Sequence, residues 1–280
     1  MLVAWKYKPR NTIIQRLDPR ARLIFMLLML ISVIYFWDLR YILVFFILSA
    51  LQYSLARLTF RETRRAWLLM GPLIVILTVF TFLTGRGREG VFVEEHLLGQ
   101  WHLVGKITIT FSIEKIFFAI AQMVRILSIS LLAIALPYTI DPSLYGVTFR
   151  GLGLPDKFAY AMDLAFRLVP TLGRDFSITY DAQRARGYEL EKIKGGPLEQ
   201  IRRIAPLLVP VVIQAIVGGE EVIDAMDLRA FGVGKRSWLP QLTYRTKDIA
   251  LIIFSVLIFV ASTTLSVMGY GNFWVPGVFK

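Results

Sequence analysis

Cysteine is absent from this chain of 280 residues, and histidine occurs only twice. The absence of thiols excludes disulfide bonds and thiolate metal sites. Acidic residues are also scarce, because 20 Asp and Glu stand against 32 Lys and Arg, which gives a net charge of +12. Several long stretches have no charge of either sign, and 56% of the residues are hydrophobic, against about 45–50% in a typical soluble domain. These shortages point to a membrane protein.

Sequence patterns that carry catalysis are missing as well. The chain has no GxxxxGK[ST] phosphate-binding loop and no HExxH zinc motif, and no serine or cysteine nucleophile stands in a recognisable set with a histidine. Glu220-Glu221 resembles the start of the glutamate motif of intramembrane proteases, but Ala225 stands where that motif has an arginine. We therefore expect a protein that is not an enzyme, has no metal site and needs no cofactor.

Five stretches are apolar enough to cross a bilayer, for which a helix needs about 20 mostly apolar residues. They are Leu23–Trp37, Tyr41–Ala56, Trp67–Thr84, Ile116–Ile140 and Ile249–Phe279, and the fourth contains a single charged residue, Arg125. The first two are slightly short, and arginines at their ends can extend them by keeping their guanidinium groups at the membrane surface. We expect an all-α integral membrane protein with about five transmembrane helices.

The distribution of basic residues predicts which loops face the cytoplasm. Met1–Arg22 carries six Lys or Arg, and the loop between the second and third crossings carries four arginines against the single Glu62. Because cytoplasmic loops are enriched in Lys and Arg, the N-terminus and this loop are expected in the cytoplasm. The same distribution explains the net charge better than nucleic-acid binding does, so no nucleic-acid partner is expected.

The outer segment, about residues 85–114, is expected to hold a small extracytoplasmic β-hairpin-like loop. Val91–Val93 and Lys106–Phe111 alternate or are β-branched, with glycines between them. His96 and His102, the two histidines of the chain, also lie here. They could form a metal or proton site, but isolated histidines in an exposed loop are more often polar surface, and the sequence leaves their role open.

Between residues 141 and 248 the pattern predicts two long helices joined by a polar turn. From Phe158 onward, apolar residues recur at spacings of three, four and seven, and Gly187 is a plausible end of this helix. The second helix is expected from Leu198 to the glycines at 232 and 234. Inside it, Ile204–Gly219 is free of charge, which allows a sixth crossing, although its length and two prolines favour a helix lying against the membrane or the other crossings.

The expected organisation therefore has three parts. A membrane bundle of four crossings occupies residues 1–140, a cytoplasmic helical region occupies 141–248, and a C-terminal transmembrane helix with its tail occupies 249–280.

Each of the two long helices ends in the same eight-residue pattern: Asp-Ala, three variable residues, Arg, a small residue and an aromatic. The two copies of this phrase are DAQRARGY and DAMDLRAF. In both copies an arginine, Arg186 or Arg229, has small or apolar neighbours. Small neighbours let another backbone approach closely, and a guanidinium prefers acceptors that its planar fork can bridge. Two equivalent arginine-bearing helix ends imply two equivalent binding sites, most simply on a dimeric partner. Chance composition in a basic helix is the alternative interpretation.

Two long segments resemble the T-component of energy-coupling factor (ECF) transporters, the transmembrane coupling subunit of prokaryotic vitamin and metal-ion importers. They are AFRLVPTLGRDFSITYDAQRARG (Ala165–Gly187) and PLLVPVVIQAIVGGEEVIDAMDLRAFG (Pro206–Gly232). IIQRLDPRARLIF (Ile13–Phe25) resembles that family's entry into its first crossing, and Ile140–Met162 resembles its entry into the coupling helices. The resemblance covers nearly the whole chain, and the paired arginine phrases are its most specific part.

In that family, each coupling helix ends in a short motif centred on arginine, which docks into a groove on one of two ABC-type ATPase subunits. The resemblance therefore implies that the two long helices here are cytoplasmic coupling helices. The implied docking residues are Ala185, Arg186, Gly187, Leu228, Arg229 and Ala230, with Asp181, Ala182, Asp224 and Ala225 as support. The second motif departs from the Ala-Arg-Gly form of many relatives.

The resemblance also implies the partners and the place of action. They are two ABC-type ATPase subunits, identical or different, a membrane substrate-binding S-component, and the lipid bilayer of a prokaryotic cell membrane. The chain would transmit ATP-driven motion of the ATPases to the S-component, for uptake of a vitamin or a transition-metal ion that the sequence does not identify.

Arg125 is expected to hold the bundle together or to contact the S-component. A self-sufficient membrane channel or secondary transporter is the alternative function. It would need several ionisable groups converging in mid-membrane, and the apolar runs offer only Arg125.

Overall fold

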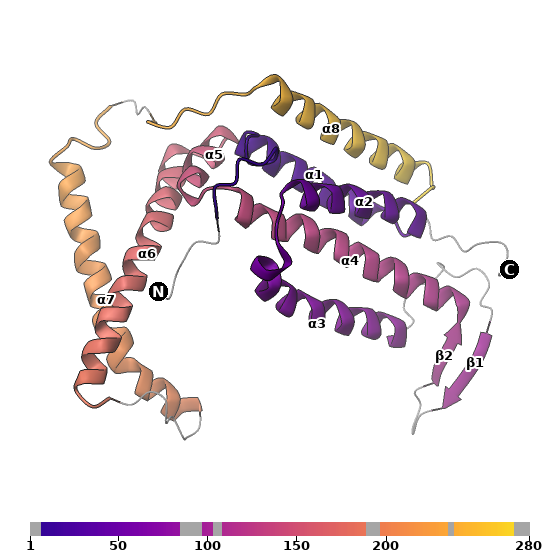
Figure 1. Cartoon of the computed structure of the whole chain (residues 1–280), viewed down its shortest axis with the longest axis horizontal. Coiled ribbons are helices and arrows are strands. Elements are labelled where there is room, and N and C mark those ends of the chain that lie inside the picture. Colours follow the sequence, from indigo (N-terminus) through magenta and orange to yellow (C-terminus); the bar gives the residue numbers. More distant parts are fainter. Residues whose placement is uncertain (1–6, 85–96, 103–107, 189–196, 235–237, 272–280) are drawn as a thin grey trace. The chain divides into compact units, whose positions relative to one another are not determined.

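A computed structural model of the chain describes residues 7–84, 97–102, 108–188, 197–234 and 238–271, with side chains throughout except at 84, 97–102, 108–112 and 197–203. Nearly all elements are helices (Figure 1). The chain divides into two compact units, one within Pro142–Leu242 and the other formed by Lys6–Asp141 together with Thr243–Lys280. We describe each unit by itself.

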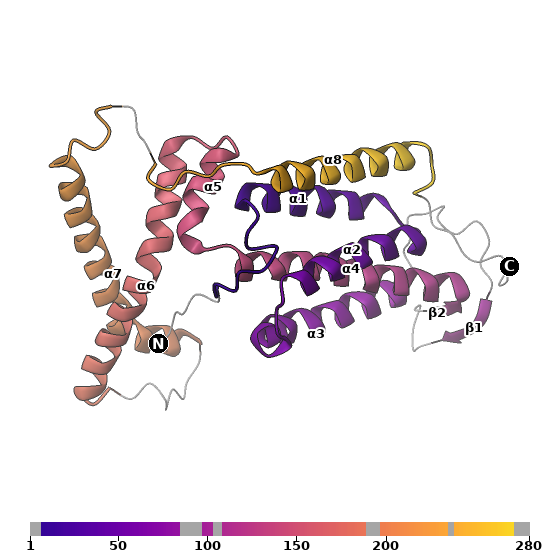
Figure 2. The ribbon, with the colours of Figure 1, turned by 45° about the horizontal axis from the view of Figure 1, so that its top comes forward.

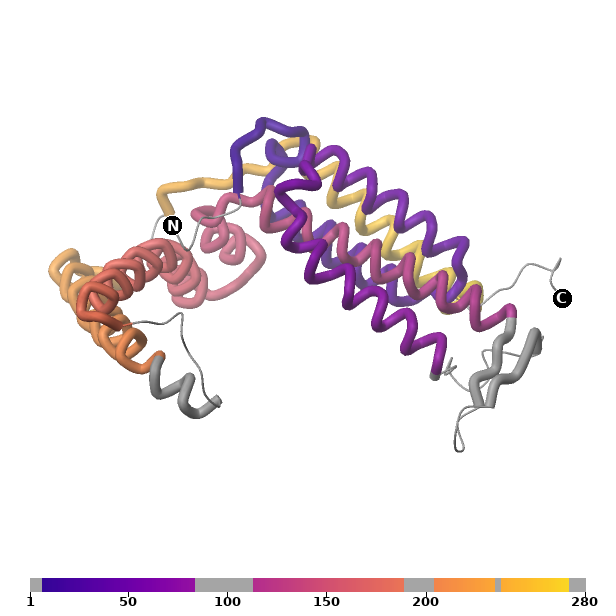
Figure 3. The backbone as a smooth tube through the Cα atoms, turned by 60° about the horizontal axis from the view of Figure 1, so that its bottom comes forward, coloured from indigo at the N-terminus to yellow at the C-terminus, as the bar shows by residue number. Residues whose placement is uncertain are grey.

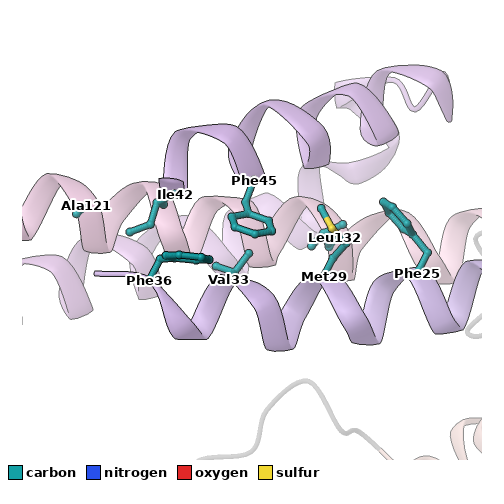
Figure 4. Packing of buried hydrophobic residues seen from close by; sticks show 8 residues of the cluster. All are labelled: Phe25, Met29, Val33, Phe36, Ile42, Phe45, Ala121 and Leu132. Atoms are coloured by element: carbon teal, nitrogen blue, oxygen red, sulfur yellow. The ribbon is translucent and has the colours of Figure 1, made fainter. Parts of the chain in front are cut away.

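The bundle unit contains five helices that run alongside one another (Figure 3): α1 (Pro19–Tyr35), α2 (Leu39–Leu55), α3 (Phe60–Thr84), α4 (Ile113–Thr139) and α8 (Thr246–Val267). Its core is a layer of apolar side chains from α1, α2 and α4, with Phe36 from the turn after α1 (Figure 4). The cluster consists of Phe25, Met29, Val33, Phe36, Ile42, Phe45, Ala121 and Leu132. Many large apolar side chains on the outer faces remain exposed, as expected where lipid covers a protein. The chain is an all-α integral membrane protein, as the sequence predicts.

Helix lengths bear on the number of crossings. Within the described residues, four helices are long and apolar enough to cross a membrane: Phe60–Leu83, Ile113–Thr139, Ile204–Asp227 and Thr246–Val267. By contrast, α1 and α2 have 17 residues each, which at about 1.5 Å per residue gives about 26 Å against a hydrocarbon core of about 30 Å. The count of five crossings stays a prediction.

Aspartates begin α1 and α2. The side chain of Asp18 accepts a hydrogen bond from the Arg20 backbone N–H, and Pro19 follows as the first helical residue, where its missing N–H is not needed. Asp38 caps α2 in the same way, through the Arg40 backbone N–H. The sequence DPR at residues 18–20 therefore fixes the start of the first helix.

Two short antiparallel strands, β1 (Leu97–His102) and β2 (Thr108–Ser112), lie between α3 and α4, with His102 paired to Thr108. The expected first strand, Val91–Val93, and His96 lie outside the described residues. Gly99, expected between the strands, instead lies within β1 opposite Phe111, next to an irregularity in the register. A glycine in a strand commonly marks such an irregularity.

The second unit consists of a short 3₁₀ turn (Pro142–Leu144), α5 (Tyr145–Gly151), α6 (Asp156–Ala185) and α7 (Pro197–Asp227). A close approach holds α5 on α6: a Cβ at Gly146 would lie 2.7 Å from the Asp163 Cβ and 2.8 Å from the Ala159 carbonyl oxygen. Only glycine fits there. Next to it, the rings of Tyr145 and Phe166 stack with centroids 4.8 Å apart.

The two long helices α6 and α7 lie against one another in antiparallel order (Figures 1 and 2). Near the end of α6, Gln183 Nε2 donates to the carbonyl oxygen of Pro206, 3.4 Å away near the start of α7. Near the start of α6, the Tyr160 hydroxyl lies 3.3 Å from the sulfur of Met226 at the end of α7. Both helices continue through their internal prolines as single elements.

Candidate functional site

The first arginine phrase forms the C-terminal cap of α6. Arg186 is the capping residue, and Gly187 follows with φ +83°, in the left-handed region. The Tyr188 N–H donates to the Gln183 carbonyl at 3.0 Å, and the Gly187 N–H donates to the Arg184 carbonyl at 3.0 Å. This pair of bonds is the Schellman motif, which satisfies the last carbonyls of a helix.

The second phrase builds the same cap on α7. The Phe231 N–H donates to the Met226 carbonyl at 3.0 Å, and the Ala230 N–H donates to the Asp227 carbonyl at 2.9 Å. Arg229 stands where Arg186 stands in the first cap. Ala230 takes the left-handed position with φ +52°, although it carries a Cβ. The repeated phrase is therefore a repeated helix end, with arginine as the last residue before the chain turns.

This finding corrects the expected end of the second helix. The expected stop was at the glycines at 232 and 234, but α7 ends at Asp227 and the first left-handed residue is Ala230, with Gly232 following at φ +102°. Sequence reasoning preferred glycine because only glycine adopts this conformation without strain. The comparison of the two phrases contained the better signal, since Ala230 aligns with Gly187.

Both arginines are presented outward. The side chains of Arg186 and Arg229 are exposed, and in the part of the chain that the structure describes neither has a hydrogen bond or an ion pair. Ala185, Gly187 and Ala230 are exposed beside them, and Leu228 is 90% exposed. An arginine held out from a rigid helix end is of the residue type that often anchors protein interfaces.

The supporting residues lie one turn before each cap. Asp181, Ala182, Asp224 and Ala225 are exposed. Their backbones continue the helices: the Arg186 N–H lies 3.3 Å from the Ala182 carbonyl, and the Leu228 N–H lies 3.0 Å from the Asp224 carbonyl. Their small or short side chains leave the surface beside each arginine open.

The two caps lie at opposite ends of the helix pair. The Phe231 ring packs on the Tyr160 ring near the start of α6, with centroids 4.7 Å apart, so Arg229 lies near this end. Arg186 lies 26 residues further along α6, which at about 1.5 Å per residue is about 39 Å. One helix pair thus carries two equivalent arginine tips, one near each end.

Arg125 lies inside the bundle unit. It is 8% exposed, and its guanidinium donates to the carbonyl oxygen of Phe36 and, at 3.2 Å, to Gln122 Oε1. The guanidinium carbon also lies 4.4 Å from the centroid of the Trp37 ring. These contacts attach α4 to the turn that follows α1, so the charge is used within the bundle.

Sequence reasoning missed a second cluster of polar side chains, at the start of α8. Asp248 is 1% exposed, and its two carboxylate oxygens accept the backbone N–H groups of Asp18 and Arg245, each at 2.8 Å. Arg20 pairs with Asp18 at 2.8 Å and lies over the Tyr244 ring at 3.9 Å. The available signal was the DPR sequence, which places an acid and a base before an apolar run without giving their partner.

No group of three or more His, Asp or Glu side chains that could hold a metal ion occurs among the side chains that the structure describes. The candidate site is a protein surface made of two helix ends.

Comparison with known proteins shows to which family the sequence is similar. Residues 10–236 match the protein family CbiQ, described as cobalt transport protein. Several curated proteins named energy-coupling factor transporter transmembrane protein EcfT are similar over most of their length. The protein of Staphylococcus aureus is 28% identical over 264 residues, covering 88% of this chain and 90% of the relative.

Relatives from other organisms match as extensively. The EcfT protein of Bacillus subtilis is 28% identical over 282 residues, covering 92% of this chain and 97% of the relative. That of Thermotoga maritima is 24% identical over 287 residues, covering 98% and 96%. Both long helices lie within these matches.

Proposed function

Because the chain belongs to the CbiQ family of cobalt transport proteins and is a T-component of an ECF transporter, we propose that it is the coupling subunit between two ABC-type ATPases and a membrane substrate-binding S-component. ATP hydrolysis belongs to the ATPases and cargo recognition to the S-component. The T-component transmits motion from one to the other for uptake of a vitamin or a transition-metal ion.

The observation that carries the proposal is the pair of equivalent arginine-bearing caps. A dimeric ATPase offers two equivalent grooves, and two equivalent tips on one rigid helix pair can engage both at once. The groups that would dock are Ala185, Arg186 and Gly187 at one tip, and Leu228, Arg229 and Ala230 at the other. An exposed guanidinium gains most when acceptors in a groove bind it in bidentate fashion.

The composition of α6 supports a cytoplasmic place for both tips. This helix carries eight charged residues in 30 and cannot cross a bilayer. Although Ile204–Asp227 is long and apolar enough to cross, α7 packs along α6 from Pro206 to Met226. A helix paired over this length with a polar helix is better placed at the membrane surface. Arg186 and Arg229 then lie on the same side of the cell membrane. That side is the cytoplasmic one, where the N-terminus is also expected.

An exposed apolar stripe on α7 supports the S-component as the other partner. Leu208, Val212 and Ile216 follow one another at four-residue spacing and are 49–58% exposed, with Val209, Ile213 and Val217 beside them. A stripe of this kind on a surface helix needs an apolar cover. A membrane protein lying against α7 would provide it.

Charge reversal at the two tips tests the proposal. Arg186→Glu and Arg229→Glu should each abolish uptake, because a charged partner group left unpaired in a groove costs about 2–5 kcal/mol. Each variant should also release at least one ATPase from the complex in a pull-down from membranes. Membrane insertion should stay unchanged, since both side chains are exposed.

Arg184→Glu is the matched control. Arg184 is also exposed on the last turn of α6, two residues before Arg186, and lies outside the cap triplet. The control should bind the ATPases and support uptake like the unchanged protein. Normal uptake and normal ATPase recovery in both tip variants would show that the ATPases attach elsewhere.

A further inference from the structure

A patch of arginines lies where α3 begins. Arg57, Arg61, Arg64 and Arg65 are exposed, and none has an ion pair or hydrogen bond through its side chain in the described ranges. The one acid among them, Glu62, is engaged by Lys8 Nζ at 3.0 Å and by Arg10. Within the described residues, the positive charge of the patch is therefore not cancelled by ion pairs.

The patch continues into an apolar face of the same helix. Arg61, Arg64, Arg65 and Leu68 follow the i, i+3, i+4, i+7 spacing of one helix face. Leu68 is 62% exposed, and the face continues to Val75 and Val79, seven and eleven residues further along, which are 57% and 49% exposed. One strip of surface thus carries cations at one end and aliphatic side chains along the rest.

Aromatic side chains mark the depth of this patch in the membrane. The Trp67 indole N–H lies 3.5 Å from the Tyr53 hydroxyl, and the Tyr138 hydroxyl donates to the Glu62 carbonyl at 3.2 Å. Trp and Tyr gather at the membrane–water interface. These contacts also hold the inner face of α3 on α2 and α4, so the arginines point away from the bundle at the depth of lipid phosphates.

We propose that this strip is a binding site for an anionic phospholipid. The guanidinium groups of Arg61, Arg64 and Arg65 bind the phosphate and the net negative headgroup, because guanidinium matches phosphate in bidentate geometry. The acyl chains lie along Leu68, Val75 and Val79. The proposal is independent of the coupling function and of which leaflet the arginines occupy, since it depends only on charge and depth.

A single fluorescent label can test the lipid preference. The chain has no cysteine, so Leu68→Cys gives one attachment site for a bimane. The labelled full chain is reconstituted in mixed phosphatidylglycerol and phosphatidylcholine vesicles, with bromine on the acyl chains of one lipid or the other. Brominated phosphatidylglycerol should quench the label about fivefold more strongly per molecule than brominated phosphatidylcholine does. About fivefold is the preference that a single arginine gives near an anionic surface.

A label at Val79→Cys is the matched control. It lies on the same exposed face further along the helix, about 17 Å from Leu68, so the two brominated lipids should quench it equally. The triple variant Arg61→Gln, Arg64→Gln, Arg65→Gln should lose the preference at Leu68, and the corresponding triple lysine variant should keep most of it. Unchanged quenching at Val79 in each variant shows that the helix is still inserted.

Three results would overturn the proposal. One is equal quenching of the Leu68 label by both lipids, and another is a preference that survives in the glutamine variant. The third is a Leu68 label that neither lipid reaches, which would mean that protein covers this face.

Discussion

At the scale of single residues, the repeated phrase owes its form to the backbone of a helix end. Gly187 and Ala230 occupy the same left-handed position, with φ +83° and +52°. Glycine adopts it freely, while an L-residue with a Cβ costs roughly 1–2 kcal/mol. The second cap is therefore strained where the first is relaxed, although both present an arginine.

Ala230→Gly should raise the free energy of unfolding by about 1 kcal/mol, because it relieves this strain. Gly187→Ala should lower it by a similar amount. Chemical unfolding of the purified chain in detergent measures both changes.

Gly218→Ala is the control for Gly187→Ala. A Cβ at either glycine meets no atom within 4 Å, but Gly218 lies inside α7 with ordinary helical geometry. The change should stabilise the chain by up to about 1 kcal/mol. Equal effects at the two glycines would contradict the role assigned to the left-handed turn.

At the scale of elements, the contact of α5 with α6 depends on a glycine and on a partly desolvated acid. The close approach at Gly146 places α5 against Asp163. Burial raises the pKa of Asp163 above its ordinary value, and the charge of Arg167, one turn further along α6, opposes this only in part. The protonated form therefore fits the folded state better than the charged form does.

The raised pKa predicts a pH dependence of stability. The contribution of Asp163 to folding is fully present below its unfolded pKa of about 4 and is lost as the pH rises through the folded pKa. Asp163→Asn should therefore raise the melting temperature at pH 7 and have little effect at pH 3. Thermal unfolding at both pH values checks this, with the exposed Asp181→Asn as a control that should change neither. A fall in melting temperature at pH 7 would mean that the pairing with Arg167 outweighs desolvation.

At the scale of the whole molecule, the chain leaves the bundle unit after residue 141 and returns at residue 243. The residues next to both of these points are hydrogen-bonded to the start of α1. Arg22 donates to the Thr139 carbonyl at 2.8 Å, and Asp248 accepts the Asp18 N–H at 2.8 Å. The residues that would receive motion from the coupling helices are thus joined to one another through α1.

Asp248→Asn tests this connection. The amide nitrogen cannot accept a hydrogen bond, so one of the two backbone N–H groups loses its acceptor and the other keeps only a neutral one, at a cost of about 1.5–3 kcal/mol. The melting temperature should fall, and protease should cut more readily near residues 243–245. Arg40→Gln, which alters a half-exposed ion pair at the opposite end of the bundle, should cost less than about 1 kcal/mol. Equal losses in the two variants would show that Asp248 has no special role.

The sequence by itself determined the fold class, the family and the two arginine phrases. Apolar runs longer than the helices of a soluble core are stable almost only in a bilayer. A phrase that is repeated in the sequence can be recognised without a structure. Periodicity also located α6, because one apolar stripe and a terminal glycine act locally, within a few turns of one helix.

Only the tertiary structure decided how these parts meet. Three features depend on neighbours that are distant in sequence or on a strained backbone that another contact holds in place. They are the left-handed conformation of Ala230, the close approach of α5 at Gly146, and the hydrogen bond that Asp248 accepts at the start of α1. The arrangement of Arg186 and Arg229 at opposite ends of one helix pair belongs here too. Local pattern fixes where a helix ends, whereas packing along the antiparallel pair fixes where that end lies.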